Sequence, residues 1–132
     1  MDVDCLGHTV RIDTAYVNEP PEEIVRQVDE YAAGSRREFD LTVSFPDGFD
    51  GRVGRALSEI PYGETRSYGE LADDLDTSPR AVGGGCARNP IPLVVPCHRV
   101  LRSDGSVGGF QYPGLKERLL ELESGHVSLS EW

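Results

Sequence analysis

Apolar positions recur along the chain at two spacings, and each spacing predicts a kind of element. Residues 8–17 alternate loosely and carry β-forming side chains, which predicts a strand. Residues 20–34 open on a Pro-Pro pair, repeat apolar side chains at helical spacing and close on glycine, which predicts a helix. Alternating apolar side chains over 38–45 predict a second strand. A turn sequence at 46–48 then marks a boundary, so we expect a small N-terminal α/β part over 1–48.

The rest of the chain predicts short helices. A helix over roughly 49–59 is followed by another that opens at Ser67, where Glu70 three residues later completes a capping box. A tight turn leads to a third helix over 79–89, and two short helices joined in this way form a helix-turn-helix unit. Three glycines lower the helix propensity of this third helix, so we expect them to permit close approach to another backbone or to DNA.

The last predicted elements are a hairpin and a helix. Asp104-Gly105 is a strong turn signal, so we expect a β-wing over 102–109, followed by an amphipathic helix over 115–123. The predicted fold class is therefore α+β: a reduced N-terminal α/β part, then a winged helix-turn-helix-like domain over 49–125, then a tail over 126–132.

Composition narrows the class of protein. The chain has 132 residues, 38% of them hydrophobic and 27% charged, which is typical of a globular domain. It has no run of about 18 apolar residues, and its acidic start lacks a secretory signal pattern, so we expect a cytoplasmic protein with no membrane partner. The three cysteines lack zinc-site spacing, so we expect neither a disulfide framework nor a structural metal site; they are Cys5, Cys86 and Cys97.

The net charge of −10 at first argues against a nucleic-acid partner. The acidity is concentrated, however: residues 1–50 carry −8, while residues 51–115 are neutral and all their bases are arginine. Arginine forms forked contacts with phosphate and stacks on bases, although surface ion pairs remain the plain alternative. Only one of the 13 basic residues is a lysine, Lys116, and such an acidic, lysine-poor chain indicates a halophilic, salt-rich cytoplasm.

Cys97 is the focal candidate for chemistry. It follows Pro96 at the end of an apolar run and precedes His98 and Arg99. A neighbouring base lowers the pKa of a thiol or accepts its proton, and the thiolate is the nucleophile. A buried structural thiol is the alternative, because free cysteine usually behaves as a small hydrophobic residue.

The order of motifs is distinctive: IPYGETRSYGELA, PRAVGG, NPIPLVVPCHRV, SVGGF and LLELE follow one another. Over residues 39–123 the sequence resembles the alkylguanine-DNA alkyltransferases, also called methylated-DNA–protein-cysteine methyltransferases. The resemblance implies DNA repair by stoichiometric transfer of the alkyl group from O6-alkylguanine in double-stranded DNA, with base flipping. It implies a protein that acts once and needs no cofactor; we also expect a monomer and no metal.

The resemblance also assigns roles to residues of this chain. Cys97 is the alkyl acceptor, and His98, held by Glu123, deprotonates it through a water molecule. Tyr68 helps to turn the nucleotide out and donates a hydrogen bond to guanine. Arg80 enters the stack in place of the flipped base. Each role also has a purely structural alternative: packing for the Tyr68 ring, a surface ion pair for Arg80, and a solvated position at a helix end for Glu123.

Three further positions follow from the same resemblance. Asn89 is a hinge between the helix-turn-helix unit and the active-site strand, and Gly69 and Ser103 make minor substrate or DNA contacts. The chain departs from the family at Phe110, where a tyrosine is common, and in its shorter N-terminal part. These departures concern substrate range and rate rather than the reaction.

Two other classes of function compete with alkyl transfer. One is a non-enzymatic lesion sensor or winged-helix DNA-binding protein, which Cys97 argues against, because relatives that only sense lesions lack the acceptor cysteine. The other is a small Cys-His hydrolase, for which the sequence shows no oxyanion motif.

Overall fold

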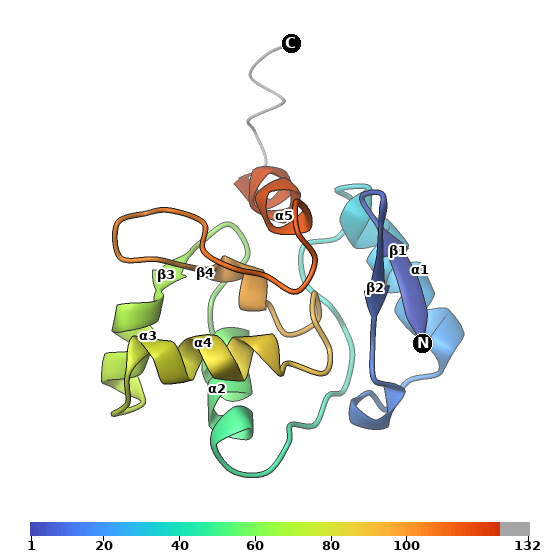
Figure 1. Cartoon of the computed structure of the whole chain (residues 1–132). Coiled ribbons are helices and arrows are strands. Elements are labelled where there is room, and N and C mark those ends of the chain that lie inside the picture. Colours follow the sequence, from blue (N-terminus) through green and yellow to red (C-terminus); the bar gives the residue numbers. More distant parts are fainter. Residues whose placement is uncertain (125–132) are drawn as a thin grey trace.

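The computed structural model describes residues 1–124 (Figure 1). Residue 125 and the expected tail over 126–132 lie outside the described residues. Within residues 1–124 the chain forms five α-helices, four short strands and two 3-10 turns, so the expectation of a mixed helix and strand fold is confirmed. The helices are α1 (Pro21–Ala32), α2 (Phe49–Ser58), α3 (Tyr68–Asp74), α4 (Pro79–Ala87) and α5 (Leu115–Ser124). The strands are β1 (Asp2–Cys5), β2 (His8–Arg11), β3 (Arg66–Ser67) and β4 (Val100–Leu101), and the 3-10 turns are η1 (Thr14–Tyr16) and η2 (Cys97–Arg99).

The N-terminal hairpin differs from the sequence prediction. β1, which the pattern missed, pairs antiparallel with β2 through a two-residue loop whose residues, Leu6 and Gly7, both have positive φ. The predicted strand over 8–17 is wrong beyond Arg11. The side chain of Asp13 accepts a hydrogen bond from the amide of Ala15, and this cap starts the η1 turn instead of continuing the strand.

The predicted strand over 38–45 is also wrong, although its alternation of half-buried and exposed side chains is present. Only one bridge forms, between Val17 and Val43. Side chains take up backbone amides that a partner strand would need: Gln27 Oε1 accepts from the amide of Asp40 at 2.7 Å, and the Glu19 carboxylate from that of Thr42 at 2.8 Å. The segment is therefore an extended strap rather than part of a sheet.

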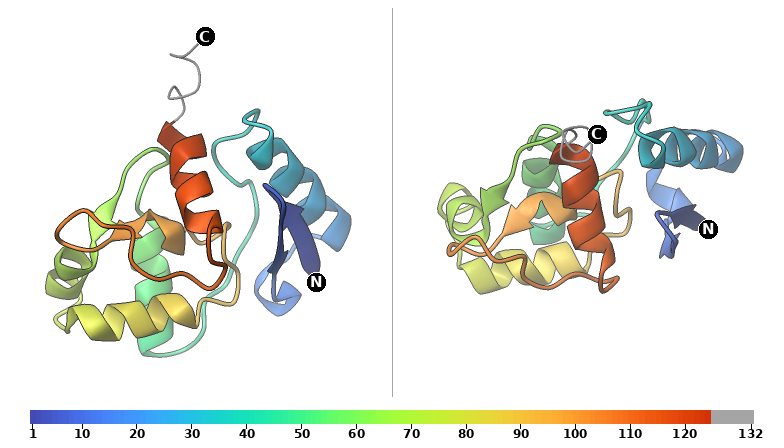
Figure 2. Two further views of the ribbon diagram at one scale, coloured as in Figure 1. Left: turned by 45° about the horizontal axis from the view of Figure 1, so that its top comes forward. Right: turned by 90° about the horizontal axis from the view of Figure 1, so that it is seen from above.

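The helices surround one continuous hydrophobic core. In Figure 2, α1 and the β1–β2 hairpin lie on one side, α2, α3 and α4 on the other, and α5 between them. The predicted α1 is confirmed: its glutamates occupy the first turn, and Ile24, Val28 and Tyr31 are fully buried. None of the helices in residues 1–124 has the length and apolar character needed to cross a bilayer.

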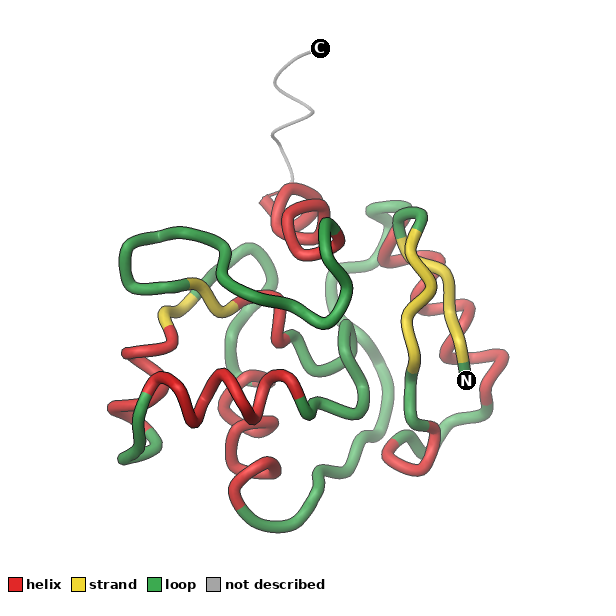
Figure 3. Tube along the Cα trace, in the orientation of Figure 1, coloured by secondary structure: helices red, strands yellow, loops and turns green. Residues whose placement is uncertain are grey.

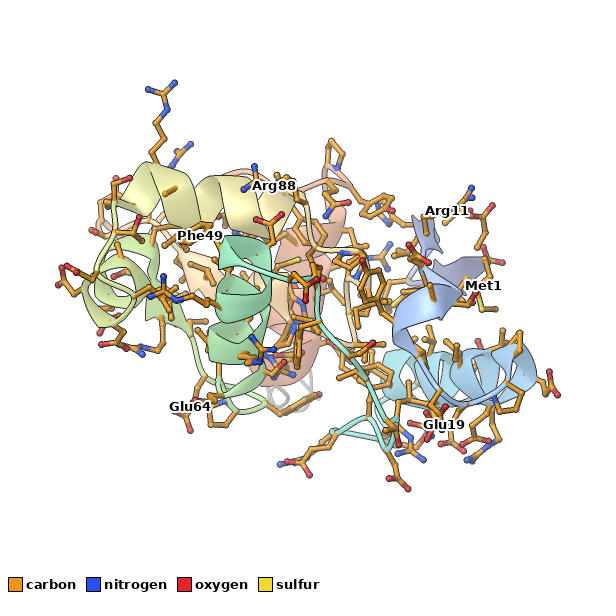
Figure 4. All side chains as sticks on the ribbon, turned by 90° about the horizontal axis from the view of Figure 1, so that it is seen from below. Met1, Arg11, Glu19, Phe49, Glu64 and Arg88 are labelled. Carbon is orange, nitrogen blue, oxygen red and sulfur yellow. The ribbon has the colours of Figure 1, made fainter. Side chains whose placement is uncertain are left out.

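The predicted capping box of α3 is confirmed, because the Ser67 and Glu70 side chains each bond the other residue's backbone amide. The structure also settles what one α4 glycine does. A Cβ on Gly85 would lie 2.7 Å from the Val53 side chain of α2, so glycine lets α4 approach α2 closely. The Arg88 guanidinium then forks onto the Asp50 carboxylate at 2.8 and 2.9 Å, at the start of α2 (Figure 4).

The predicted β-wing over 102–109 is wrong in its strands. A turn does form, with the Arg102 amide donating to the Ser106 carbonyl at 2.9 Å, but the chain then continues as a loop (Figure 3). Gly108 has φ of +75°, and the Gly109 carbonyl accepts a hydrogen bond from Lys116. The returning segment is therefore drawn toward α5 instead of pairing as a second strand. β4 pairs in parallel with β3 instead.

Candidate active site

A cavity of about 670 Å³ lies beside α3 and α4 and is also lined by the loop that follows β4. Four of the predicted site residues, which come from separate elements, line it: Tyr68, Arg80, Cys97 and Ser103. The other lining residues are Pro79, Gly83, Cys86, Ala87, Arg102, Gly109, Phe110 and Gln111. The volume is in the range of small-molecule sites, so the cavity has room for a nucleobase.

Cys97 is 2% exposed and begins the η2 turn directly after Pro96. Burial raises the pKa of its thiol to about 11, while the Asn89 side chain and the charge of Lys116 act in the opposite direction. The thiol is therefore neutral near pH 7, and forming a thiolate requires a base.

His98 follows Cys97 and is fully buried. Its Nε2 lies 2.7 Å from Glu123 Oε2. Burial lowers the pKa of His98 even though Glu123 favours its charged form, so the ring is neutral at pH 7. Burial alone would raise the pKa of Glu123, but hydrogen bonds from His98 and Arg99 dominate and lower it to about 2.

These charges fix the tautomer of the imidazole. An ionised Glu123 can only accept hydrogen bonds, so Nε2 of His98 carries the ring proton and Nδ1 keeps its lone pair. Nδ1 is buried and has no hydrogen-bond partner among residues 1–124. The site therefore holds a free basic nitrogen one residue from the thiol, with a carboxylate behind it to stabilise an imidazolium.

Two side chains that the sequence analysis missed complete this network. Arg99 Nε and Nη2 fork onto Glu123 at 2.6 and 2.9 Å, and its Nη1 donates to the Ile60 carbonyl at 2.7 Å. Its position next to His98 was the available signal. The Tyr31 hydroxyl donates to Glu123 from α1, 92 residues away. The sequence carried no signal for this contact, because helical spacing marked Tyr31 only as a core residue.

Asn89 joins the end of α4 to the segment that leads to Cys97. Its Nδ2 donates to the Val95 carbonyl at 2.8 Å, and its Oδ1 accepts from the Ile91 amide at 3.1 Å. Both the nitrogen and the oxygen of the Asn89 side chain therefore form hydrogen bonds with the backbone of the same loop. This arrangement fixes the approach of that loop to the thiol.

Of the four predicted DNA-facing residues, Tyr68, Arg80 and Ser103 line the cavity and Gly69 does not. Arg80 is exposed in the first turn of α4 and makes no ion pair within the described chain, while Tyr68 is half-buried. Ser103 is exposed. Gly69 does not line the cavity; a Cβ there would lie 3.3 Å from Ser103 Oγ, so Gly69 accommodates its neighbour.

The sequence analysis assigned no site role to two further residues, Cys86 and Lys116. Cys86 lines the same cavity as Cys97, and burial together with the Cys97 charge raises the pKa of its thiol to about 12. Lys116 is fully buried. The only sequence feature that distinguished it is that the chain has no other lysine. Across residues 1–124, no three His, Cys, Asp or Glu side chains gather closely enough to hold a metal ion.

The fold and the site define a class of protein: one with a buried cysteine at an open cavity, a histidine next to it that is paired with a carboxylate, and two short helices beside the cavity. Comparison with known proteins gives the particular family. Residues 48–125 match the family model described as the DNA-binding domain of 6-O-methylguanine DNA methyltransferase.

Curated relatives agree. The chain is 45% identical over 106 residues to a methylated-DNA–protein-cysteine methyltransferase of Methanosarcina acetivorans, covering 76% of this chain and 67% of the relative. It is 47% identical over 111 residues to one from Mycolicibacterium paratuberculosis, covering 80% and 67%. Among solved structures, the Mycobacterium tuberculosis OGT in complex with DNA superposes with a TM-score of 0.73 at 44% identity, covering 77% of this chain and 66% of that one.

The chain therefore belongs to the O6-methylguanine-DNA methyltransferase family, and the resemblance found in the sequence is confirmed. It spans about two thirds of the length of these relatives. The alternative of a lesion sensor without acceptor chemistry finds no support in these two curated relatives, both named as methyltransferases.

Proposed function

We propose that this protein repairs O6-alkylguanine in double-stranded DNA by transferring the alkyl group irreversibly to Cys97. The observation that carries the proposal is the buried Cys97 thiol at the cavity, followed by a histidine whose Nδ1 is free and whose Nε2 is held by an ionised Glu123.

The reaction balances without a cofactor. The Cys97 proton passes to Nδ1 of His98 through a water molecule, and Glu123 stabilises the imidazolium that forms. The thiolate sulfur forms a bond to the alkyl carbon, the bond from that carbon to guanine O6 breaks, and the electron pair stays with guanine. Guanine then takes up the proton. The products are an S-alkyl cysteine and an intact guanine, and the thioether is not reversed, so each molecule acts once.

Entry of the base into the cavity needs the nucleotide to leave the duplex. We propose that Arg80, exposed at the start of α4 and lining the cavity, fills the gap in the stack. Tyr68, half-buried in the cavity wall, donates a hydrogen bond to the base as charge develops on it. Asn89 holds the loop before Cys97, Ser103 lines the cavity, and Gly69 leaves room for the Ser103 side chain.

We further propose that residues 49–125 form a helix-turn-helix DNA-binding and alkyl-acceptor domain, with α4 as the recognition helix. Residues 1–48 form a reduced N-terminal part whose role includes supplying Tyr31 to Glu123. Because one chain supplies every group of the reaction, we propose that it works as a monomer on DNA.

Intact-mass spectrometry of the protein after incubation with a duplex that contains O6-methylguanine tests the proposal. We expect one added methyl group per molecule, which peptide mapping assigns to Cys97, and no further turnover with excess DNA. A protein that binds the duplex without gaining mass, in either dilute or molar KCl, would refute alkyl transfer and leave a lesion-binding function.

Arg80→Ala separates base extrusion from chemistry. We expect methyl transfer from duplex DNA to fall by about tenfold to a hundredfold, because the opened stack loses a filler worth ~1–3 kcal/mol. Transfer from free O6-methylguanine base should change little, since the free base needs no extrusion. The measurement is the single-turnover rate with each substrate, and Arg88→Ala, at the C-cap of the same helix, is the control. Equal losses on both substrates would contradict the assigned role.

A further inference from the structure

Tyr31 carries a buried hydroxyl group that its packing does not need. The residue lies in the last turn of α1 and is fully buried. Its ring packs against Phe39 at 5.2 Å and edge-on against Tyr62 at 6.2 Å between ring centres, contacts that a phenylalanine would make equally well. A buried hydroxyl costs free energy unless it forms a hydrogen bond, so its role depends on its partner.

The partner of this hydroxyl is the carboxylate that also holds the imidazole. Tyr31 donates to Glu123 Oε2, and the same oxygen accepts from His98 Nε2 at 2.7 Å. The Tyr31 hydroxyl oxygen lies 3.4 Å from His98 Nε2, so the three groups meet at one point. Arg99 reaches Oε1 through Nε at 2.6 Å and Oε2 through Nη2 at 2.9 Å. Among the described residues, Tyr31 is therefore the one donor to this carboxylate that does not belong to the two residues after Cys97.

We propose that Tyr31 is a positioning residue for alkyl transfer, which keeps His98 a free base until the Cys97 thiol gives up its proton. Its hydroxyl shares Glu123 Oε2 with the Nε2–H group of His98. Each donor that an anionic oxygen binds takes up part of its charge, so Tyr31 leaves less of that charge to stabilise a second proton on the imidazole. The inference rests on the proposed function and deepens it, since it gives the N-terminal part a share in the proton transfer.

The electrostatics of the pair give the direction of the effect. Burial raises the pKa of Glu123, but the hydrogen bonds it accepts, that of Tyr31 included, outweigh burial and lower the pKa to about 2. Burial and the Glu123 charge raise the pKa of Tyr31, so the phenol stays protonated and remains a donor. Without this hydroxyl, the pKa of Glu123 and that of His98 should both rise, because the carboxylate charge is shared more fully with the imidazole. The other titratable and charged groups that act on Tyr31, Glu123 and His98 are Cys5, Tyr62, Arg99 and Lys116.

The Tyr31→Phe variant tests the role in transfer, because it removes the hydroxyl and keeps the ring. The readout is the single-turnover rate of methyl transfer from duplex DNA as a function of pH. At about pH 6 we expect the rate to fall about tenfold relative to the wild type, because more of His98 already carries the second proton. At about pH 8 the two rates should agree. A purely structural loss would instead lower the rate at every pH.

Two measurements without DNA test the same hydroxyl. In a nitrogen NMR titration of the His98 ring, the pKa of His98 should be higher in Tyr31→Phe than in the wild type. In denaturant unfolding, the stability that Glu123 contributes above its ordinary pKa of 4.5 is lost as the pH falls through its folded pKa. Because that folded pKa is higher in the variant, the loss should be smaller and complete at a higher pH.

Tyr62→Phe is the matched control, since its hydroxyl belongs to the same aromatic cluster but donates to the Leu122 carbonyl at 3.3 Å. It should keep the wild-type rate profile and the wild-type titration of His98. A folded Tyr31→Phe protein in which His98 titrates as in the wild type would overturn the inference, whatever its transfer rate. A wild type that transfers no methyl group would refute the proposed function, while the titration of His98 would still test the role of Tyr31.

Discussion

Replacing Cys97 by serine is expected to abolish methyl uptake from O6-methylguanine DNA. A serine hydroxyl fits the same space, but His98 cannot generate a significant amount of alkoxide, and the neutral oxygen is a poor nucleophile toward an alkyl carbon. Binding of the lesion-containing duplex should persist, because Arg80 and the two short helices are unchanged. Intact mass measures the transfer, and fluorescence anisotropy measures the binding.

Cys5→Ser is the control for this loss. Cys5 is also buried, and burial likewise raises the pKa of its thiol to about 11, yet it lies in β1 and outside the cavity. It should therefore accept no alkyl group, and the Cys5→Ser protein should still gain one methyl. A methylated Cys97→Ser protein, or a methyl group mapped to Cys86, would contradict the assignment of the acceptor.

Glu123→Gln is expected to lose both stability and transfer. The amide keeps the shape of the side chain but cannot hold the imidazolium of His98, and it leaves the Arg99 guanidinium buried without its counter-ion. Removing one partner of a buried ion pair typically costs about 3–5 kcal/mol, so the variant should melt well below the wild type. Denaturant unfolding measures the first effect and single-turnover methyl transfer the second.

The pH dependence of the free energy of unfolding is a second test of the Glu123 carboxylate. The pKa of Glu123 is about 2 in the folded protein against an ordinary value of 4.5. Its stabilising contribution is therefore complete above about pH 4.5 and is lost as the pH falls toward 2. Glu123→Gln should lack this acid-sensitive component, whereas Glu121→Gln, an exposed acid on the same helix, should keep it. Identical acid profiles for the wild type and Glu123→Gln would contradict the network.

The N-terminal part, although small, forms hydrogen bonds with residues of the site and of the segment next to it. Through Tyr31 it contributes a hydroxyl donor to Glu123, and through the Arg11 amide it donates to the Tyr112 hydroxyl at 2.9 Å. Both contacts reach residues that follow Cys97 in the chain. The hairpin and α1 therefore buttress α5 and the loop over the cavity as well as adding to the core.

Local signals predicted the helices well and the strands poorly. The capping box at Ser67 and Glu70, and the proline near the start of α4, act within a few residues, so their consequences can be read along the chain. The segment over 38–45 and the expected wing over 102–109 instead depended on whether a distant partner strand was present. In the first segment, the side chains of Glu19 and Gln27 accept hydrogen bonds from backbone amides that a partner strand would need. In the second, Lys116 donates a hydrogen bond to the Gly109 carbonyl, and no second strand forms.

The sequence by itself determined the chemistry: a cysteine followed by a histidine, preceded by two short helices, in an order that resembles one family. It also located the excess acidity in the first 50 residues, while residues 51–115 are neutral and carry arginine as their only Lys or Arg residue type. Only the tertiary structure decided which groups surround the thiol. Tyr31 and Lys116 meet the site from α1 and α5, and contacts between residues so far apart depend on how the helices pack, which no local pattern encodes.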